Sequence, residues 1–150
     1  MERLTVGFLS GLAAGVIVGV ISLTLYLTGL CELCLVAIGG GIFQSHILPE
    51  TAGLGWLILG VIDHLILSAS LGIAMALILT RFGDNLAILK GAFFGSVVWY
   101  LLIGIFSPLS GYLPEAPDLA ALFILLGYHV AFGGLVAYLI VKYSKTKTAA

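Results

Sequence analysis

A long apolar run extends from Trp56 to Thr80, and its first half contains the adjacent ionisable residues Asp63 and His64. A helix of about 20 apolar residues crosses the hydrocarbon core of a bilayer, so this run is long enough to span one. A charged side chain at the centre of such a span costs roughly 2.5–3.5 kcal/mol on insertion scales. Asp63 and His64 are therefore candidate functional residues, and the fold must offset the cost of placing them there.

The composition indicates an integral membrane protein. Hydrophobic residues make up 61% of the 150 residues and charged residues only 9%, and the mean hydropathy is +1.24. A soluble domain with this composition would expose one continuous apolar patch, so we expect a lipid bilayer to surround the chain. The net charge is −1 and no basic cluster precedes the C-terminal segment, which excludes nucleic acid as a partner.

Four apolar stretches are predicted to cross the membrane as helices within a single domain, residues 1–150. Residues 30–55 are also apolar, but Gly39-Gly40-Gly41 and Pro49 interrupt them, so they are predicted to form an interfacial or re-entrant segment between spans 1 and 2. The predicted fold is an all-α, up-down-up-down bundle of four transmembrane helices. The four predicted spans are approximately residues 5–29, 54–80, 86–106 and 118–141.

The basic residues predict the orientation of this bundle. Loops that are rich in Lys and Arg stay on the cytoplasmic side of a membrane. With four spans, every basic residue falls on one side, which predicts a multi-pass protein of the cell membrane with both termini in the cytoplasm. These residues are Arg3, Arg81, Lys90, Lys142, Lys145 and Lys147.

Glycine recurs at every fourth position of the first predicted span, at Gly7, Gly11, Gly15 and Gly19. This spacing places the four glycines on one face of a helix. A glycine face leaves a groove into which a neighbouring backbone fits closely. The row is therefore predicted to be a packing face, either within the chain or in a homo-oligomer or larger membrane complex.

The second and fourth predicted spans run in the same direction, and each carries a histidine. At 1.5 Å per residue, His64 is expected ~12 Å and His129 ~17 Å below the outer boundary. Each histidine lies on the small-residue face of its helix, the face expected to look into the bundle. Tyr100 is expected at a comparable level, on a row of the third predicted span that steps by four through Ala92, Ser96 and Gly104. Asp63, Tyr100, Tyr128 and the two histidines are thus predicted to share one buried polar layer.

Three interpretations of this layer remain open. It could be a structural hydrogen-bond network that fixes helix packing. It could hold a b-type haem between His64 and His129, because two imidazoles at matching depth are the arrangement an iron with two axial histidines requires. It could also form part of a proton, ion or small-solute path through an oligomer, with Asp63 and His64 as titrating groups.

Cys31 and Cys34 form a C-x-x-C pair at the outer end of the first predicted span. Such a pair can cycle between dithiol and disulfide. The segment resembles the C-x-L-C motif of the quinone-coupled disulfide-forming membrane proteins, which are also four-helix bundles, but the second cysteine pair that those proteins use is missing. The alternatives are two buried, inert thiols, a plain disulfide, or a metal site with His46, for which a fourth ligand is lacking.

A broader resemblance is carried by glycines and aromatic residues of the last two predicted spans. They are Lys90-Gly91, Gly95, Trp99, Phe106 and Pro108 in the third, and Gly127-Tyr128 and Phe132-Gly133 in the fourth. With these features, and in span order and loop lengths, the chain resembles the YqhR-type family of small four-span bacterial membrane proteins. The resemblance implies a four-span architecture, and it implies no activity and no role for His64, His129 or the C-x-x-C pair.

The sequence contains none of the common motifs of hydrolases, metalloproteases or phosphate-binding enzymes. We therefore favour a non-catalytic structural or accessory membrane subunit that associates with itself or with a larger complex. A redox protein with haem b and a proton, ion or solute transporter are the alternatives.

Overall fold

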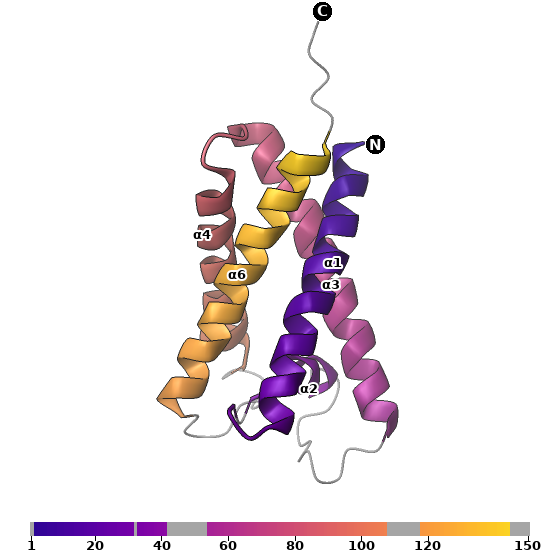
Figure 1. The fold of residues 1–150 in the computed structure, drawn as a ribbon, viewed down its shortest axis with the longest axis vertical. Coiled ribbons are helices and arrows are strands. Elements are labelled where there is room, and N and C mark those ends of the chain that lie inside the picture. Colours follow the sequence, from indigo (N-terminus) through magenta and orange to yellow (C-terminus); the bar gives the residue numbers. More distant parts are fainter. Residues whose placement is uncertain (1, 32, 42–53, 108–117, 145–150) are drawn as a thin grey trace, which may run out of the picture.

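The computed structural model describes residues 2–31, 33–41, 54–107 and 118–144, and this part of the chain is helical without strands (Figure 1). In chain order the elements are α1 (Arg3–Leu27), α2 (Leu35–Gly41), α3 (Leu54–Phe82), α4 (Ala87–Trp99), the π-helix η1 (Tyr100–Phe106) and α6 (Leu119–Tyr143).

Among the described residues, four helical stretches are long and apolar enough to cross a membrane. They are Arg3–Leu27, Leu57–Phe82, Ala87–Phe106 and Leu119–Tyr143. The prediction of an all-helical chain with four helices of spanning length is confirmed. The short helix α2 lies within the predicted interfacial or re-entrant segment, whereas residues 42–53 of that segment lie outside the described residues.

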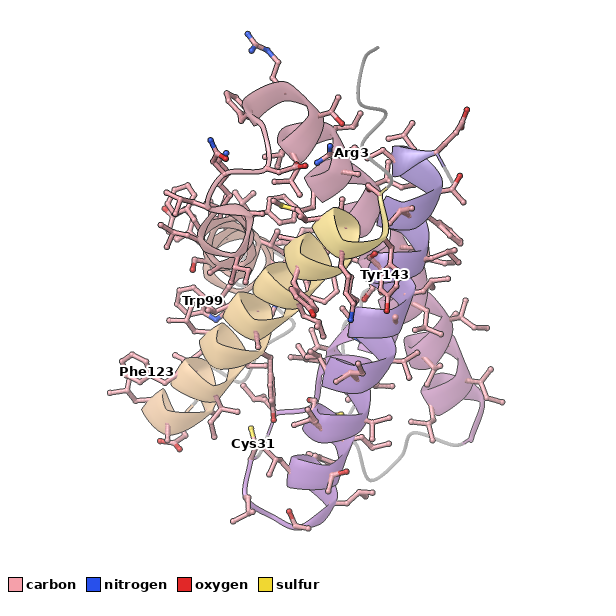
Figure 2. The ribbon with its side chains drawn as sticks, turned by 45° about the horizontal axis from the view of Figure 1, so that its top comes forward. Arg3, Cys31, Trp99, Phe123 and Tyr143 are labelled. Carbon is pink, nitrogen blue, oxygen red and sulfur yellow. The ribbon has the colours of Figure 1, made fainter. Side chains whose placement is uncertain are left out.

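Large apolar side chains cover the outside of the four long helices. They include Phe8, Ile66, Phe93 and Phe123, and Figure 2 shows Phe123 projecting from α6 away from the other helices. An apolar surface of this kind suits the hydrocarbon core of a bilayer, where the backbone polar groups are already satisfied within each helix.

Successive long helices run in opposite directions, so both ends of the described chain lie at one end of the bundle (Figure 1). The helices form two close pairs, α1 with α3 and α4 with α6, and the pairs meet mainly through α1 and α6. In contrast, α3 and α4 barely touch. We call the half of the bundle with both chain ends the terminal half and the half that contains α2 the cavity half.

The first pair is held by the glycine row of α1, which packs against α3. A Cβ atom at Gly7 would lie 2.7 Å from the Gly72 carbonyl oxygen, and one at Gly11 would lie 3.0 Å from the Gly72 Cα atom. The backbones are therefore as close as two helices can come. Because α3 of the same chain covers this row, the row is not available to a second copy of the protein.

The second pair is built in the same way. A Cβ atom at Gly91 would lie 2.7 Å from the Ala137 Cβ atom, and one at Gly133 would lie 3.0 Å from the Gly95 backbone nitrogen. A Cβ atom at Gly95 would collide with the backbone carbonyl of His129. Glycine therefore permits direct backbone contact in both pairs.

A change of helical period occurs where α4 continues as η1. The buried positions of α4 include Gly95 and Val98, and the next buried position is Ile103, five residues further on. A spacing of five residues between successive buried positions is expected in a π-helix, because its hydrogen bonds join residues five apart. The step turns Ile103 and then Ser107 toward the interior.

Polar contacts close the terminal half at the turn between α3 and α4. Lys90 Nζ donates to the carbonyl oxygens of Phe82 at 2.8 Å and Gly83 at 3.0 Å, which satisfies the C-terminal end of α3. Gly83 has a φ of 75°, the left-handed conformation common after a helix end. Arg3 at the start of α1 forms an ion pair with Asp84 in this turn.

Candidate functional site

A cavity lies in the cavity half, between α3 and η1, with α1 and α6 behind it and α2 at one end. The space not occupied by protein atoms in and at the mouth of this cavity is about 740 Å³, and this volume includes space that is open to the outside. Most of its lining is apolar. The polar side chains that line it are Asp63, His64, Ser68, Ser107, Tyr128 and His129.

The cavity exists because the two glycine-packed pairs diverge. The α1–α3 and α4–α6 contacts are close, but α3 and α4 lie apart over most of their length. The lining residues Leu67 and Leu71 of α3 face Leu102 and Ile103 of η1 across the space that remains. In the described part of the chain, α3 and η1 have few contacts with each other on this side of the cavity.

His64 is held at the junction of α1, α3 and the cavity. Its Nε2 atom lies 3.0 Å from the carbonyl oxygen of Gly15. Since a carbonyl only accepts hydrogen bonds, Nε2 carries the hydrogen and donates it. A Cβ atom at Gly19 would lie 3.1 Å from the same nitrogen. The glycine row of α1 therefore also makes room for the imidazole.

His129 lies on α6 at the opposite wall and is buried, with 9% of its surface exposed. Its Nδ1 atom lies 2.7 Å from the carbonyl oxygen of Leu125, one turn earlier on the same helix. Since a carbonyl only accepts hydrogen bonds, Nδ1 carries a hydrogen and donates it. The two histidines line one cavity, but each donates its hydrogen bond to a backbone carbonyl rather than to the other histidine.

The described residues do not show a haem site between His64 and His129. An axial ligand must offer a nitrogen lone pair to the iron. His64 uses Nε2 as a hydrogen-bond donor to Gly15, and the α1 backbone at Gly19 covers that atom. His64 therefore presents no free Nε2 to an iron, and the described residues show no haem site.

Asp63 lines the cavity beside His64. Its Oδ2 atom is enclosed and has no hydrogen-bond partner among the described residues. The backbone of α2 passes close by, because a Cβ atom at Gly39 would lie 3.2 Å from Oδ2 and 3.1 Å from the Gly60 carbonyl oxygen. Glycine at position 39 thus lets α2 pack beside the Oδ2 atom of Asp63, while the half-buried side chain still lines the cavity.

Tyr128 links the cavity to the cysteine pair. Its ring is buried, and its hydroxyl lies near Ser22, Cys31 and Cys34 but has no hydrogen-bond partner within bonding distance in the described part of the chain. Ser22 accepts a hydrogen bond of 3.0 Å from the backbone nitrogen of Leu35, which ties α1 to α2.

Both cysteines are buried free thiols. Cys31 Sγ lies 3.3 Å from the carbonyl oxygen of Leu33, and Figure 2 shows Cys31 at the end of the bundle farther from the chain termini. In the described part of the chain, no three His, Cys, Asp or Glu side chains could hold a metal ion together. His46, the third ligand considered from the sequence, lies outside that part.

The structure places Tyr100 away from the polar layer expected from the sequence. Its side chain is 58% exposed and does not line the cavity. The expectation placed the row of Ala92, Ser96 and Tyr100 inward, whereas the buried row of α4 is Gly91, Gly95 and Val98, and Tyr100 lies about 200° from Val98 around the helix. The π-helix then turns Ile103 inward. Asp63, His64, Tyr128 and His129 do line the same cavity.

Sequence reasoning missed Gly39, Ser68 and Ser107 as parts of the site. Ser68 lies one turn after His64, so the row of small residues on that face contained its signal. Ser107 reaches the cavity only because of the π-helix. The role of Gly39 depends on how α2 folds back onto α3.

Comparison with known proteins adds no assignment to this geometry. No family model matches the chain. No curated protein matches it, and no solved structure matches it. The resemblance to the YqhR-type family therefore stays a prediction, and the functional argument depends on the cavity itself.

Proposed function

We propose that this protein is a non-catalytic membrane protein that binds a small lipid-soluble molecule in the cavity between α3 and η1. The observation that carries the proposal is a mainly apolar cavity whose lining includes six polar side chains. Ligand sites in proteins are typically clefts with a mainly apolar lining and a few polar groups, and helix bundles commonly form them between helices.

The separation of α3 from α4 supports a route from the bilayer into the cavity. These helices barely touch, so a molecule dissolved in the hydrocarbon core reaches the cavity without crossing a layer of protein. An apolar body would contact the walls, and a polar head group would meet Asp63, Ser107 or His129.

The packing of the terminal half supports a binding function rather than the conduction of ions or solutes through a single chain. Its interior is filled by Met75, Leu79, Val136 and Ile140, of which none exposes more than 1% of its surface. An ion or a polar solute needs polar groups or water along its whole path. The polar lining belongs to the cavity half, and the apolar plug beyond it separates the cavity from the other end of the bundle.

Photolabelling with an adamantane diazirine in lipid nanodiscs tests the proposal. This probe is apolar and small, and peptide mass spectrometry locates the residues that it modifies. We expect saturable labelling of Ile103, which is buried and lines the cavity, and non-saturable labelling of Ile105, which faces outward on the same π-helix.

A pair of adjacent substitutions provides the control. Leu67 lines the cavity and Ile66 is exposed on the outside of α3. Leu67→Trp fills the cavity and should abolish labelling of Ile103, whereas Ile66→Trp should leave it unchanged. Absence of Ile103 labelling in the wild-type protein, with Ile105 labelled, would overturn the proposal.

For the orientation, the basic residues support placing the terminal half on the cytoplasmic side of the cell membrane. Arg3, Arg81, Lys90 and Lys142 lie near helix ends of that half, and positive charge is retained in the cytoplasm.

Cysteine labelling in intact cells tests this orientation. In a background with Cys31 and Cys34 changed to Ser, we compare Thr28→Cys with Asn85→Cys, because both positions are exposed and lie at opposite ends. An impermeant maleimide should reach position 28 from outside, and position 85 only after permeabilisation. The reverse pattern would contradict the proposed orientation.

A further inference from the structure

The cavity contains a carboxyl group but no lysine or arginine. Asp63 lines it, whereas the described basic side chains, those of Arg3, Arg81, Lys90 and Lys142, belong to the ends of helices in the terminal half. No permanently cationic side chain of the described part of the chain therefore neutralises Asp63.

The surroundings of Asp63 do not replace such a cation. Oδ2 is enclosed and receives no hydrogen bond from the described residues. The other titratable groups that line the cavity are His64, His129 and Tyr128, and each histidine donates a ring N–H to a backbone carbonyl, at Gly15 and Leu125, rather than to the carboxyl group. Asp63 is half-buried, and its enclosed Oδ2 atom has no donor beside it among the described residues. A cation next to this carboxylate compensates its charge, and in the absence of one the group favours taking up a proton.

The walls of the cavity suit an organic cation. Phe106, Tyr128 and Phe132 all line it, and the faces of aromatic rings attract cations, most strongly where water is excluded. Histidines and serines alone would suit many polar head groups. An unpaired carboxylate together with three aromatic rings favours positive charge on an apolar molecule.

We infer that Asp63 is the binding group for a lipophilic organic cation, such as a hydrophobic amine or a quaternary onium ion, in the cavity between α3 and η1. This inference rests on the proposed function and specifies the class of ligand. The cation enters as the Asp63 carboxyl releases its proton to water, so one positive charge replaces another and no covalent bond within the ligand changes.

Two probes of the same shape and opposite charge test the inference. Tetraphenylphosphonium is a lipophilic cation, and tetraphenylborate is its anionic counterpart. Equilibrium dialysis of each against the full chain in nanodiscs of zwitterionic lipid, corrected for binding to empty nanodiscs, gives the affinity of the protein. We expect saturable binding of about one phosphonium per chain and no saturable binding of the borate.

The proton exchange gives an independent readout on the wild-type protein. If phosphonium competes with one proton, its affinity should rise by about tenfold per pH unit while Asp63 is protonated and level off once it is ionised. Binding in a weakly buffered solution should release up to one proton per bound cation over the same range. A flat pH dependence without proton release would overturn the inference even if no variant folds.

Substitutions at Asp63 and Asp84 test which carboxyl group binds the phosphonium cation. Asp63→Asn should weaken phosphonium binding by about tenfold or more, because an ionic contact is lost, and should remove the pH dependence. Asp63→Glu should retain part of the affinity. Asp84→Asn is the matched control, since Asp84 pairs with Arg3 in the turn between α3 and α4, outside the cavity, and it should bind phosphonium like the wild type.

The outcomes separate this inference from the proposed function. Equal binding of both probes, unchanged in Asp63→Asn, would overturn the cation inference while saturable labelling of Ile103 still supported a ligand cavity. Failure of both probes to bind, together with an unlabelled Ile103, would overturn both. Size-exclusion profiles and circular dichroism of each variant show whether it has the wild-type fold.

Discussion

The terminal half and the cavity half of this bundle are built from the same four helices, but their interiors differ. The terminal half is filled by Met75, Leu79, Val136 and Ile140 and closed by the ion pair of Arg3 with Asp84. The cavity half also has buried side chains such as Leu125, but its interior includes the cavity and all the polar groups that line it.

The difference shows where a membrane bundle can place ionisable groups. Lipid chains are as apolar as leucine, so close packing and polar contacts hold such helices together. Glycine contacts run along both pairs and reach from one half into the other. The fold therefore tolerates an incompletely filled interior in the cavity half, where Asp63 and the two histidines lie.

The largest expected effect is that of a methyl group at a backbone contact of the terminal half. A Cβ atom at Gly11 would meet the Ser68 carbonyl group and lie 3.0 Å from the Gly72 Cα atom. Because a backbone cannot move aside without separating α1 from α3, Gly11→Ala should lower the free energy of unfolding by about 3 kcal/mol. Steric trapping in bicelles measures this quantity.

Two other glycines provide the comparison. At Gly127 nothing lies within 4 Å of an added Cβ atom, so Gly127→Ala should be neutral or slightly stabilising. At Gly19 the added atom would meet only the His64 ring, which has room toward the cavity, so the loss should be smaller than for Gly11→Ala. Equal losses at positions 11 and 19 would contradict the difference between the halves.

The next effect concerns truncation of a large side chain in each half. Met75 is completely buried in the terminal half, so Met75→Ala should leave a void and lower the free energy of unfolding by about 2 kcal/mol or more. Leu67 already borders the cavity, and Leu67→Ala should cost about 1 kcal/mol or less. A larger loss for Leu67→Ala would show that the cavity is closed in the membrane.

A smaller effect is expected for the hydrogen bond between His64 and the Gly15 carbonyl group. His64→Ala removes the donor and leaves the carbonyl oxygen, which still accepts within α1, so the loss should be about 1 kcal/mol. His64→Gln keeps a donor on a side chain of similar length and should recover part of the stability. No recovery would indicate that the ring contributes by its volume and not by its hydrogen bond.

The smallest effect is expected for the ion pair of Arg3 and Asp84. Both side chains are partly exposed, with 28% and 36% of their surfaces accessible. A double-mutant cycle with Arg3→Ala and Asp84→Ala should give a coupling of about 0.2–1 kcal/mol that decreases as salt is added. A salt-independent coupling would indicate that the pair is shielded from water in the membrane.

The sequence predicted the helical fold and the number of spanning helices because both follow from the length of apolar stretches. The spacing of Gly7 to Gly19 indicated a packing face, but not that α3 is what packs against it. The helix α3 packs there because Gly72 lets its backbone approach the glycines of α1. Several other rows of small residues in this chain would allow a similarly close approach, so the sequence alone does not select α3.

The site was less predictable because it depends on two local irregularities. The row of small residues chosen on the third span contained Tyr100, whereas the buried row is Gly91, Gly95 and Val98, which the π-helix continues to Ile103. Nothing in the residues 100–106 marks a change from an α-helix to a π-helix. The fold-back of α2, which brings Gly39 to Asp63, is likewise a tertiary contact without a local sequence pattern.

The division into two glycine-packed pairs has a mechanical consequence. Within each pair the backbones touch directly, so each pair behaves as one stiff unit, and the two units meet mainly along α1 and α6. Rotation about that line changes the distance between α3 and η1 and leaves the glycine contacts intact. The distance between α3 and η1 across the cavity therefore depends on the angle between the two glycine-packed pairs.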